Sequence, residues 1–126
     1  MPLVKIELAK KEPSFLQALM KETMDCIREV LGLLPDDRNI RVIAHDPALF
    51  RMKPPYEMIV EITMFSGRTK ETKKKLYRQL VDRLHKKLGI ARETVFIVIN
   101  EQPLENWGIR GGKGADEFDL GFKETI

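Results

Sequence analysis

The fold is decided by LYRQLVDRLHKKLG at residues 76–89 together with VFIVI at residues 95–99. In the first stretch leucine returns every four residues up to position 88, a spacing typical of one face of an α-helix. Gly89 stands where such a helix should stop, because glycine readily adopts the left-handed conformation of a helix end. The second stretch is apolar without interruption, which is typical of a strand buried on both faces. The two stretches therefore predict a helix and then an inner strand.

The same order of patterns occurs fifty-seven residues earlier. Alternating apolar residues at 3–8 predict a strand, and the Leu31-Gly32 pair superposes on Leu88-Gly89. The helical spacing of the first unit is carried by Phe15, Leu19, Thr23, Ile27 and Leu31. Ser14 to Gln17 form a predicted capping box at the start of this helix. Residues 40–44 alternate as a second strand, and Ile62 and Met64 belong to the first strand of the later unit.

The chain is therefore predicted to be one α+β domain of 126 residues built from two tandem βαβ units. The pseudo-repeats span residues 2–46 and 57–101, joined by a proline-containing loop and followed by a loop segment at 102–126. Each unit has parallel strands and a right-handed crossover. Together they make a four-stranded sheet with both helices on one face. Because the other face has no cover and residues 95–99 are apolar on both sides, we expect an oligomer.

Composition and charge bear on the partners and the compartment of the protein. A net charge of +3 requires no polyanionic partner. The lysines and arginines of the second helix lie opposite its leucine stripe, which indicates a solvated face rather than a nucleic-acid site. A single cysteine, Cys26, favours a reducing compartment, and neither a basic and apolar leader nor a membrane-length apolar run is present in the sequence. We therefore expect a cytoplasmic protein without a nucleic-acid or membrane partner.

The sequence also gives no reason to expect a metal or a cofactor. His45 and His85 are not at the spacing of metal ligands. The run 111–114, Gly-Gly-Lys-Gly, resembles a phosphate-binding loop, but Gly114 and then Ala115 follow Lys113, where that loop needs serine or threonine.

The chain begins Met1-Pro2 immediately before the first strand. Removal of Met1 would leave the secondary amine of Pro2 at the head of that strand. An α-amino group titrates near neutrality, and burial or a neighbouring cation lowers its pKa further. Pro2 is therefore a candidate general base at cellular pH.

Two further segments have a recognisable pattern. Gly67-Arg68-Thr69 forms the turn before the basic helix, and Trp107-Gly108-Ile109-Arg110-Gly111-Gly112 follows the last strand. Together with Pro2 they resemble the tautomerase superfamily, the family of 4-oxalocrotonate tautomerase and malonate semialdehyde decarboxylase. The length, the Asp36-Asp37-Arg38 segment and the run 115–118 are most similar to the decarboxylase branch. The resemblance implies a trimer of fused βαβ units.

The resemblance also implies roles for four residues, and a fifth, Arg110, is our own assignment. Pro2 would be the catalytic amine, Arg68 would hold a substrate carboxylate, and Asp37 would orient the reacting groups. Trp107 would form an apolar wall. The decarboxylase branch has a second arginine in the turn where this chain has only Arg68, and Arg110 could supply the missing cation. Three of these residues also have a structural alternative: Arg68 as a solvated turn residue, Asp37 as a turn former, and Trp107 as a core anchor.

Three functions remain open. The first is a cofactor-independent isomerase, in which Pro2 transfers a proton during keto-enol tautomerisation of a small 2-oxo acid. The second is a carbon-carbon lyase that decarboxylates a 3-oxo acid, as malonate semialdehyde decarboxylase does. The retained Asp37 favours the lyase and the lost second arginine disfavours it. The third is a binding module that keeps the fold while the Pro2 nitrogen is blocked.

Overall fold

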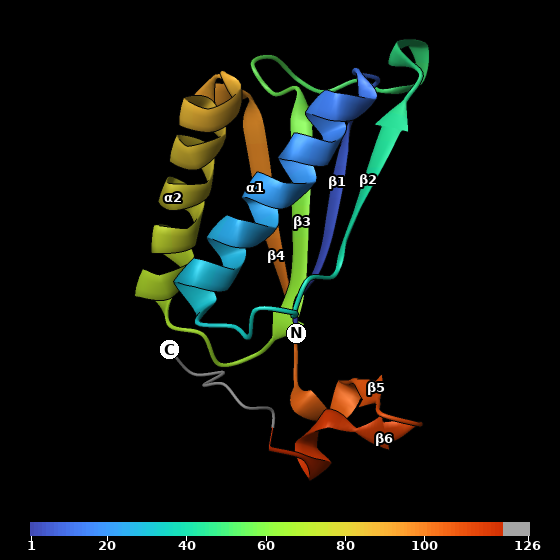
Figure 1. Cartoon of the computed structure of the whole chain (residues 1–126), viewed down its shortest axis with the longest axis vertical. Helices are drawn as coiled ribbons and strands as arrows, with labels where there is room; N and C mark the ends of the chain where they lie inside the picture. The colour runs from blue at the N-terminus through green and yellow to red at the C-terminus, as the bar shows by residue number, and fades with distance from the viewer. Residues whose placement is uncertain (120–126) are drawn as a thin grey trace.

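The structure is a computed structural model in which residues 1–119 are described. The main elements are β1 (Leu3–Ala9), α1 (Pro13–Leu31), β2 (Ile40–His45), β3 (Met58–Phe65), α2 (Lys70–Leu88) and β4 (Val95–Gln102). A small hairpin, β5 (Gly108–Ile109) and β6 (Lys113–Gly114), follows β4. Four short 3-10 turns complete the set: η1 (Pro47–Leu49), η2 (Arg92–Thr94), η3 (Leu104–Asn106) and η4 (Ala115–Glu117). Figure 1 shows α1 and α2 together on one face of the sheet.

The sheet confirms the predicted fold. Its order is β2-β1-β3-β4, with β1 parallel to β2, β3 parallel to β4, and β1 antiparallel to β3. Each parallel pair is connected by its own helix, so the two βαβ units lie side by side with their first strands at the centre. Because these central strands run in opposite directions, the second unit is turned end for end relative to the first.

The core lies between the sheet and the helices. Alternate residues of the central strands face it, and Val4, Ile6, Val60 and Ile62 are all fully buried. The leucine stripe of α2 meets them, since Leu76, Leu80 and Leu84 are also fully buried. At about 25 cal/mol per Å² of apolar surface, burial of this layer is the main force that holds the helices on the sheet.

Both predicted helix stops are present, but the predicted capping box is absent. Gly32 and Gly89 end α1 and α2 in the left-handed conformation, with φ values of 66° and 71°. Helix α1 starts at Pro13, with Glu12 at the N-cap and no side-chain cap hydrogen bond. Ser14 therefore lies inside the first turn, because proline at the first helical position is already fixed near a helical φ and starts the helix two residues before the predicted position.

The face of the sheet away from the helices is open over most of its area. Leu3, Ile43 and Phe96 are exposed there, at 42%, 37% and 39%. At one end this face is covered by the segment after β4, which was predicted as a loop over 102–126 and which holds η3, β5, β6 and η4. Residues 120–126 of that prediction lie outside the described residues.

Candidate active site

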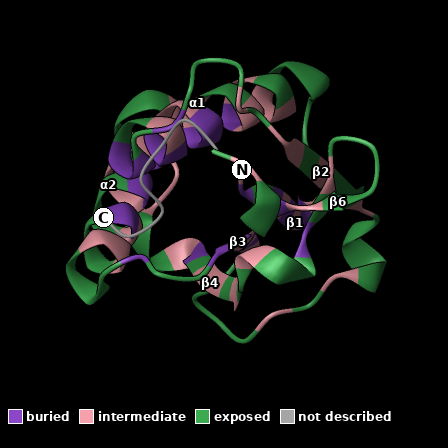
Figure 2. Ribbon diagram, turned by 90° about the horizontal axis from the view of Figure 1, so that it is seen from below, coloured by how far each residue is buried: buried purple, intermediate pink, exposed green. Residues whose placement is uncertain are grey.

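The topology gathers the predicted site residues at one end of the sheet. The antiparallel pairing places the start of β1 beside the end of β3, and the parallel pairing places the loop before β2 next to the start of β1. Pro2 thus has Asp37 on one side and the Phe65–Arg68 turn on the other. Figure 2 looks onto this end, with the amino terminus near the centre of the view.

The terminal amine and Asp37 form an ion pair. The Met1 nitrogen lies 3.0 Å from Oδ2 of Asp37, whose side chain is only 10% exposed. Burial lowers the pKa of this amine below its usual 8.0, while the hydrogen bond and charge of Asp37 raise it and the charge of Arg68 lowers it. Pro2 follows directly and is buried. The pKa of this amine is lowered on balance, because burial has a larger effect than the hydrogen bond and charge of Asp37.

Asp37 is held in place by its own loop. Asn39 donates from Nδ2 to Oδ1 of Asp37 at 3.0 Å, which leaves Oδ2 for the amine. The Asp37 backbone N–H also donates to the Leu34 carbonyl at 3.0 Å, so the residue is a turn former as well. The two readings of Asp37 are compatible, because the turn uses its backbone and the ion pair uses its side chain.

Arg68 is buried rather than solvated. It is 7% exposed, and Nη1 donates to the carbonyl of Leu31 at 3.0 Å. Leu31 is the last residue of α1, where carbonyls have no partner within the helix. The contact holds the guanidinium close enough to the amine to lower its pKa. The expectation of a solvated turn residue is therefore wrong for Arg68.

Trp107 and Phe65 form an apolar cluster beside the amine. Their rings meet edge to face with centroids 4.7 Å apart, and both residues are buried. Met1 packs against this cluster, together with Leu104, Ile109 and Phe118. Because Phe65 is on the open face of the sheet, it is the segment after β4 that buries it.

Arg110 has a different environment. It occupies the turn between β5 and β6 with a φ of 50°, followed by Gly111 and Gly112 at 85° and 87°. Its guanidinium carbon lies 4.6 Å from the ring centroid of Phe118. Arg110 thus contacts the edge of the apolar cluster through the Phe118 ring, and its described contact is not with the ion pair of Met1 and Asp37.

Three contributions were not predicted from the sequence: Asn39, Phe65 and the Leu31 carbonyl. Asn39 has a local signal, since Asp-x-Asn in a loop suggests a side-chain hydrogen bond. Phe65 ends an alternating strand on the face away from the core, so an apolar residue there indicates a local cover. The carbonyl has no sequence signal, because only the tertiary fold brings Arg68 to the end of α1.

Residues 1–119 contain neither a metal-binding cluster nor a membrane-spanning helix. No group of three or more His, Cys, Asp and Glu side chains in this range could hold a metal ion. Likewise, none of the helices in this range combines the length and the apolar character that crossing a bilayer requires.

Comparison with known proteins agrees with this geometry. Residues 37–110 match a family model described as tautomerase enzyme. The chain is 30% identical over 123 residues to probable tautomerase YusQ of Bacillus subtilis (strain 168), covering 90% of this chain and 96% of that protein. It is 36% identical over 53 residues to probable tautomerase RSp0893 of Ralstonia nicotianae, covering 42% of this chain and 76% of that protein.

Solved structures give the same fold. FG41 malonate semialdehyde decarboxylase inhibited by 3-bromopropiolate superposes with a TM-score of 0.80 and 26% identity, over 88% of this chain and 91% of that one. A fused 4-OT solved as a symmetric trimer superposes with a TM-score of 0.80 at 20% identity, over 90% of this chain and 96% of that one. On the family model and the Bacillus relative, with the fold in agreement, this chain belongs to the tautomerase family.

Proposed function

We propose that the chain, once Met1 is removed, is a cofactor-independent tautomerase that uses the amine of Pro2 on a small 2-oxo acid. The observation that carries the proposal is the position of the terminal amine, which belongs to Met1 in the intact chain: it lies 3.0 Å from Asp37 and directly before the buried Pro2, and burial and the charge of Arg68 lower its pKa. After removal of Met1 the free amine is that of Pro2, which is the next residue along the chain and is buried. A neutral secondary amine there is a base matched to cellular pH.

The proposed reaction is a proton transfer within one substrate. Arg68 holds the carboxylate, for which its guanidinium fork is well suited. The Pro2 nitrogen takes the hydroxyl proton of the enol and returns it to the carbon beside the new carbonyl, so the substrate is isomerised without a net change in composition. Trp107 and Phe65 provide the apolar wall that keeps water away. Arg110, at the rim of the same cluster, is proposed as the second cation near the developing enolate.

Decarboxylation of a 3-oxo acid is the second candidate, and the position of Asp37 favours it. A carboxylate oxygen 3.0 Å from the terminal amine can hold that amine protonated, since the hydrogen bond and charge of Asp37 raise its pKa. A protonated amine would polarise the aldehyde carbonyl of the substrate while carbon dioxide leaves. A structure of FG41 malonate semialdehyde decarboxylase is also among the similar folds.

We also propose a homotrimer in which neighbouring copies cover the open sheet face. Exposed apolar side chains occur there beside the ion pairs of Lys5 with Glu7 and Glu61, so the face offers both apolar area and charges that fix an orientation. One structural neighbour is a trimer of a fused chain. The proposed compartment is the cytoplasm, which suits the single buried thiol of Cys26.

The test uses protein whose Met1 has been removed, as checked by mass spectrometry. We expect it to enolise phenylpyruvate, and we expect Pro2→Ala to lose most of that activity because the secondary amine is gone. An unchanged rate in Pro2→Ala would remove the amine from the mechanism and favour the binding-module alternative. Asp37→Asn separates the two chemistries: it should abolish carbon dioxide release from malonate semialdehyde in a decarboxylase and change phenylpyruvate enolisation little in a tautomerase.

A further inference from the structure

A cavity lies at the opposite end of the sheet from the candidate active site, where β1 ends and β3 begins. Its volume is about 420 Å³, and it is lined by residues of both βαβ units and of the linker between them. The floor is apolar, because Leu8 and Met58 are buried at 2% and 4% exposure. None of the residues assigned above to the candidate active site lines this cavity.

The internal repeat relates this cavity to the candidate active site. The helices begin at Pro13 and Lys70 and end at Leu31 and Leu88, each fifty-seven residues apart. Three residues of the candidate active site have a counterpart fifty-seven residues away in the other unit: Lys11 for Arg68, Phe50 for Trp107 and Thr94 for Asp37. All three counterparts line the cavity. Because β1 and β3 are antiparallel, equivalent positions of the two units lie at opposite ends of the sheet. The cavity is therefore the internal counterpart of the amine site.

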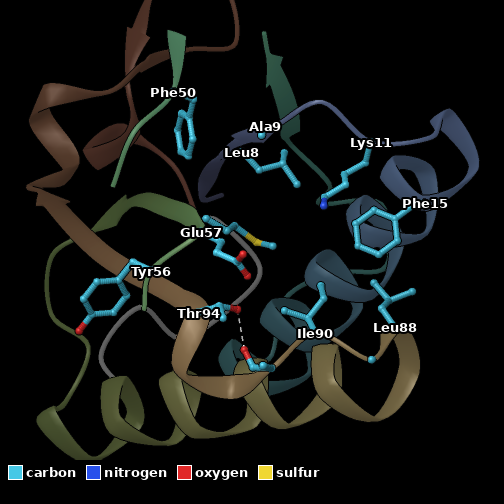
Figure 3. A pocket seen from close by; sticks show the side chains of 13 residues that line it. Leu8, Ala9, Lys11, Phe15, Phe50, Tyr56, Glu57, Leu88, Ile90 and Thr94 are labelled. Carbon is cyan, nitrogen blue, oxygen red and sulfur yellow. Dashed lines mark hydrogen bonds between the residues drawn. The ribbon is translucent and has the colours of Figure 1, made fainter. Parts of the chain in front are cut away.

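The counterpart differs where the chemistry would occur. The chain runs on through Tyr56 and Glu57 into β3, so no terminal amine can arise there. Thr94 stands at the position of Asp37 and the Lys11 ammonium at that of Arg68, while the Glu57 carboxylate lies one residue before Met58, the counterpart of Met1. Figure 3 shows both charged groups turned toward the cavity, with Phe15, Leu88 and Ile90 around it. Lys11 and Glu57 both line the cavity, so it has a positive and a negative side chain at its wall.

An aromatic ring is held at the rim. Phe50 stacks on His45, with ring centroids 5.2 Å apart and an angle of 15° between the planes. The His45 ring is itself 3.4 Å from the Glu7 carboxylate, which ties this corner to the sheet. The Phe50 ring is thus held in place by a contact outside the cavity that it lines.

We propose that this cavity is a second binding site, for a small acid with an apolar body and a hydrogen-bond donor beside its carboxylate. Lys11 pairs with the carboxylate, Glu57 accepts from the donor, and the apolar body lies among Phe15, Leu88 and Ile90. A hydroxyl and an ammonium group both meet the requirement, so 2-hydroxy acids and 2-amino acids share the recognised chemistry. The ligand is bound and not turned over, because no terminal amine can arise at this site. The proposal does not depend on the reactivity of Pro2.

The experiment is a titration of the full chain followed by amide NMR. The probes are phenyllactate and phenylalanine, with 3-phenylpropionate as the analogue that has no donor. We expect saturable shifts at Ile90 and Ala91 with phenyllactate, with phenylalanine or with both. Which of the two binds shows whether the preferred donor is a hydroxyl or an ammonium group. We expect 3-phenylpropionate to bind more weakly. Lys11→Ala should weaken binding about three- to five-fold, as expected for an ion pair open to solvent. Lys10→Ala, which removes a neighbouring exposed lysine outside the cavity, should leave the affinity unchanged.

Glu57→Gln checks the second contact. It should reduce the preference for probes with a donor over 3-phenylpropionate, while Pro2→Ala should leave all three affinities unchanged. Each variant replaces an exposed side chain or a terminal residue, and its spectrum shows whether it is folded. The proposal is overturned by the absence of saturable shifts at Ile90 and Ala91, by shifts confined to Arg68 and Trp107, or by equal affinity in Lys11→Ala and the wild type.

Discussion

Replacing Arg68 by alanine should affect activity and stability through two separate contacts. The guanidinium is 7% exposed and donates to the Leu31 carbonyl at 3.0 Å. Leu31 is 1% exposed, so truncation leaves a carbonyl at the end of α1 without this donor. An unsatisfied buried acceptor costs about 1–3 kcal/mol, and urea m-values for small domains are about 1–3 kcal/mol/M. We therefore expect the urea midpoint to fall by about 1 M.

The second contact is with the substrate. A charge-assisted hydrogen bond is worth about 1.5–3 kcal/mol, which corresponds to a loss in kcat/KM of about ten- to several-hundred-fold. In a tautomerase the loss should appear mainly as a higher KM for carboxylate substrates, because Arg68 binds and does not transfer the proton. Phenylpyruvate enolisation by the Met1-free protein measures it.

Two controls separate the contacts. Arg78→Ala removes an exposed arginine of α2 and should change neither quantity. Arg68→Lys keeps a cation but loses the planar fork, so it should recover part of the kcat/KM and less of the stability. The reasoning is refuted if Arg68→Ala unfolds at the wild-type urea concentration and retains the wild-type kcat/KM.

Three further predictions concern the rest of the molecule. Burial raises the pKa of the Cys26 thiol to about 11, so thiol reagents at pH 8 should label it only as fast as the protein opens; complete labelling of folded protein would contradict this. Hydrogen bonds from Arg38 and then Lys21 lower the pKa of Asp25 from 3.8 to about 2, so its stabilising contribution is complete above about pH 4 and is lost as the pH falls through 2. The stability difference between wild type and Asp25→Asn should vanish over that window, and a difference that persists at pH 2 would argue against the ion pair. Phe96→Glu should lower the mass measured by light scattering toward that of one chain, whereas a wild-type protein that is already monomeric would exclude the proposed trimer.

The fold could be predicted because its signals are local and repeated. The stripe ending at Leu88, the glycines at both helix stops and the apolar run at 95–99 each specify one element, and the repeat specifies how the elements combine. The start of α1 was placed too late because Ser14 also satisfies a capping pattern, and Pro13 decides the matter through its fixed φ. Local patterns therefore specify the elements well, and their boundaries less well.

The candidate site was less predictable because its contacts are between distant segments. Pro2, Asp37 and Arg68 were named from their motifs, but the burial of Arg68 depends on the end of α1, which lies thirty-seven residues earlier. Phe65 and Trp107 meet only because the chain after β4 folds back over the open face. The direction of Arg110 is set by a turn of three consecutive positive φ values.

The ion pair between the Met1 amine and Asp37 has a practical consequence for making the protein. Any affinity tag or fusion partner placed before Met1 would turn this amine into an amide, which cannot be charged and cannot act as a base. The same extension would have to leave the molecule past Asp37 and the Phe65–Trp107 cluster, where the first residue is already partly enclosed. A preparation tagged at the amino terminus would therefore be suitable for studying the fold but not the activity, until a protease exposes the amine of Pro2.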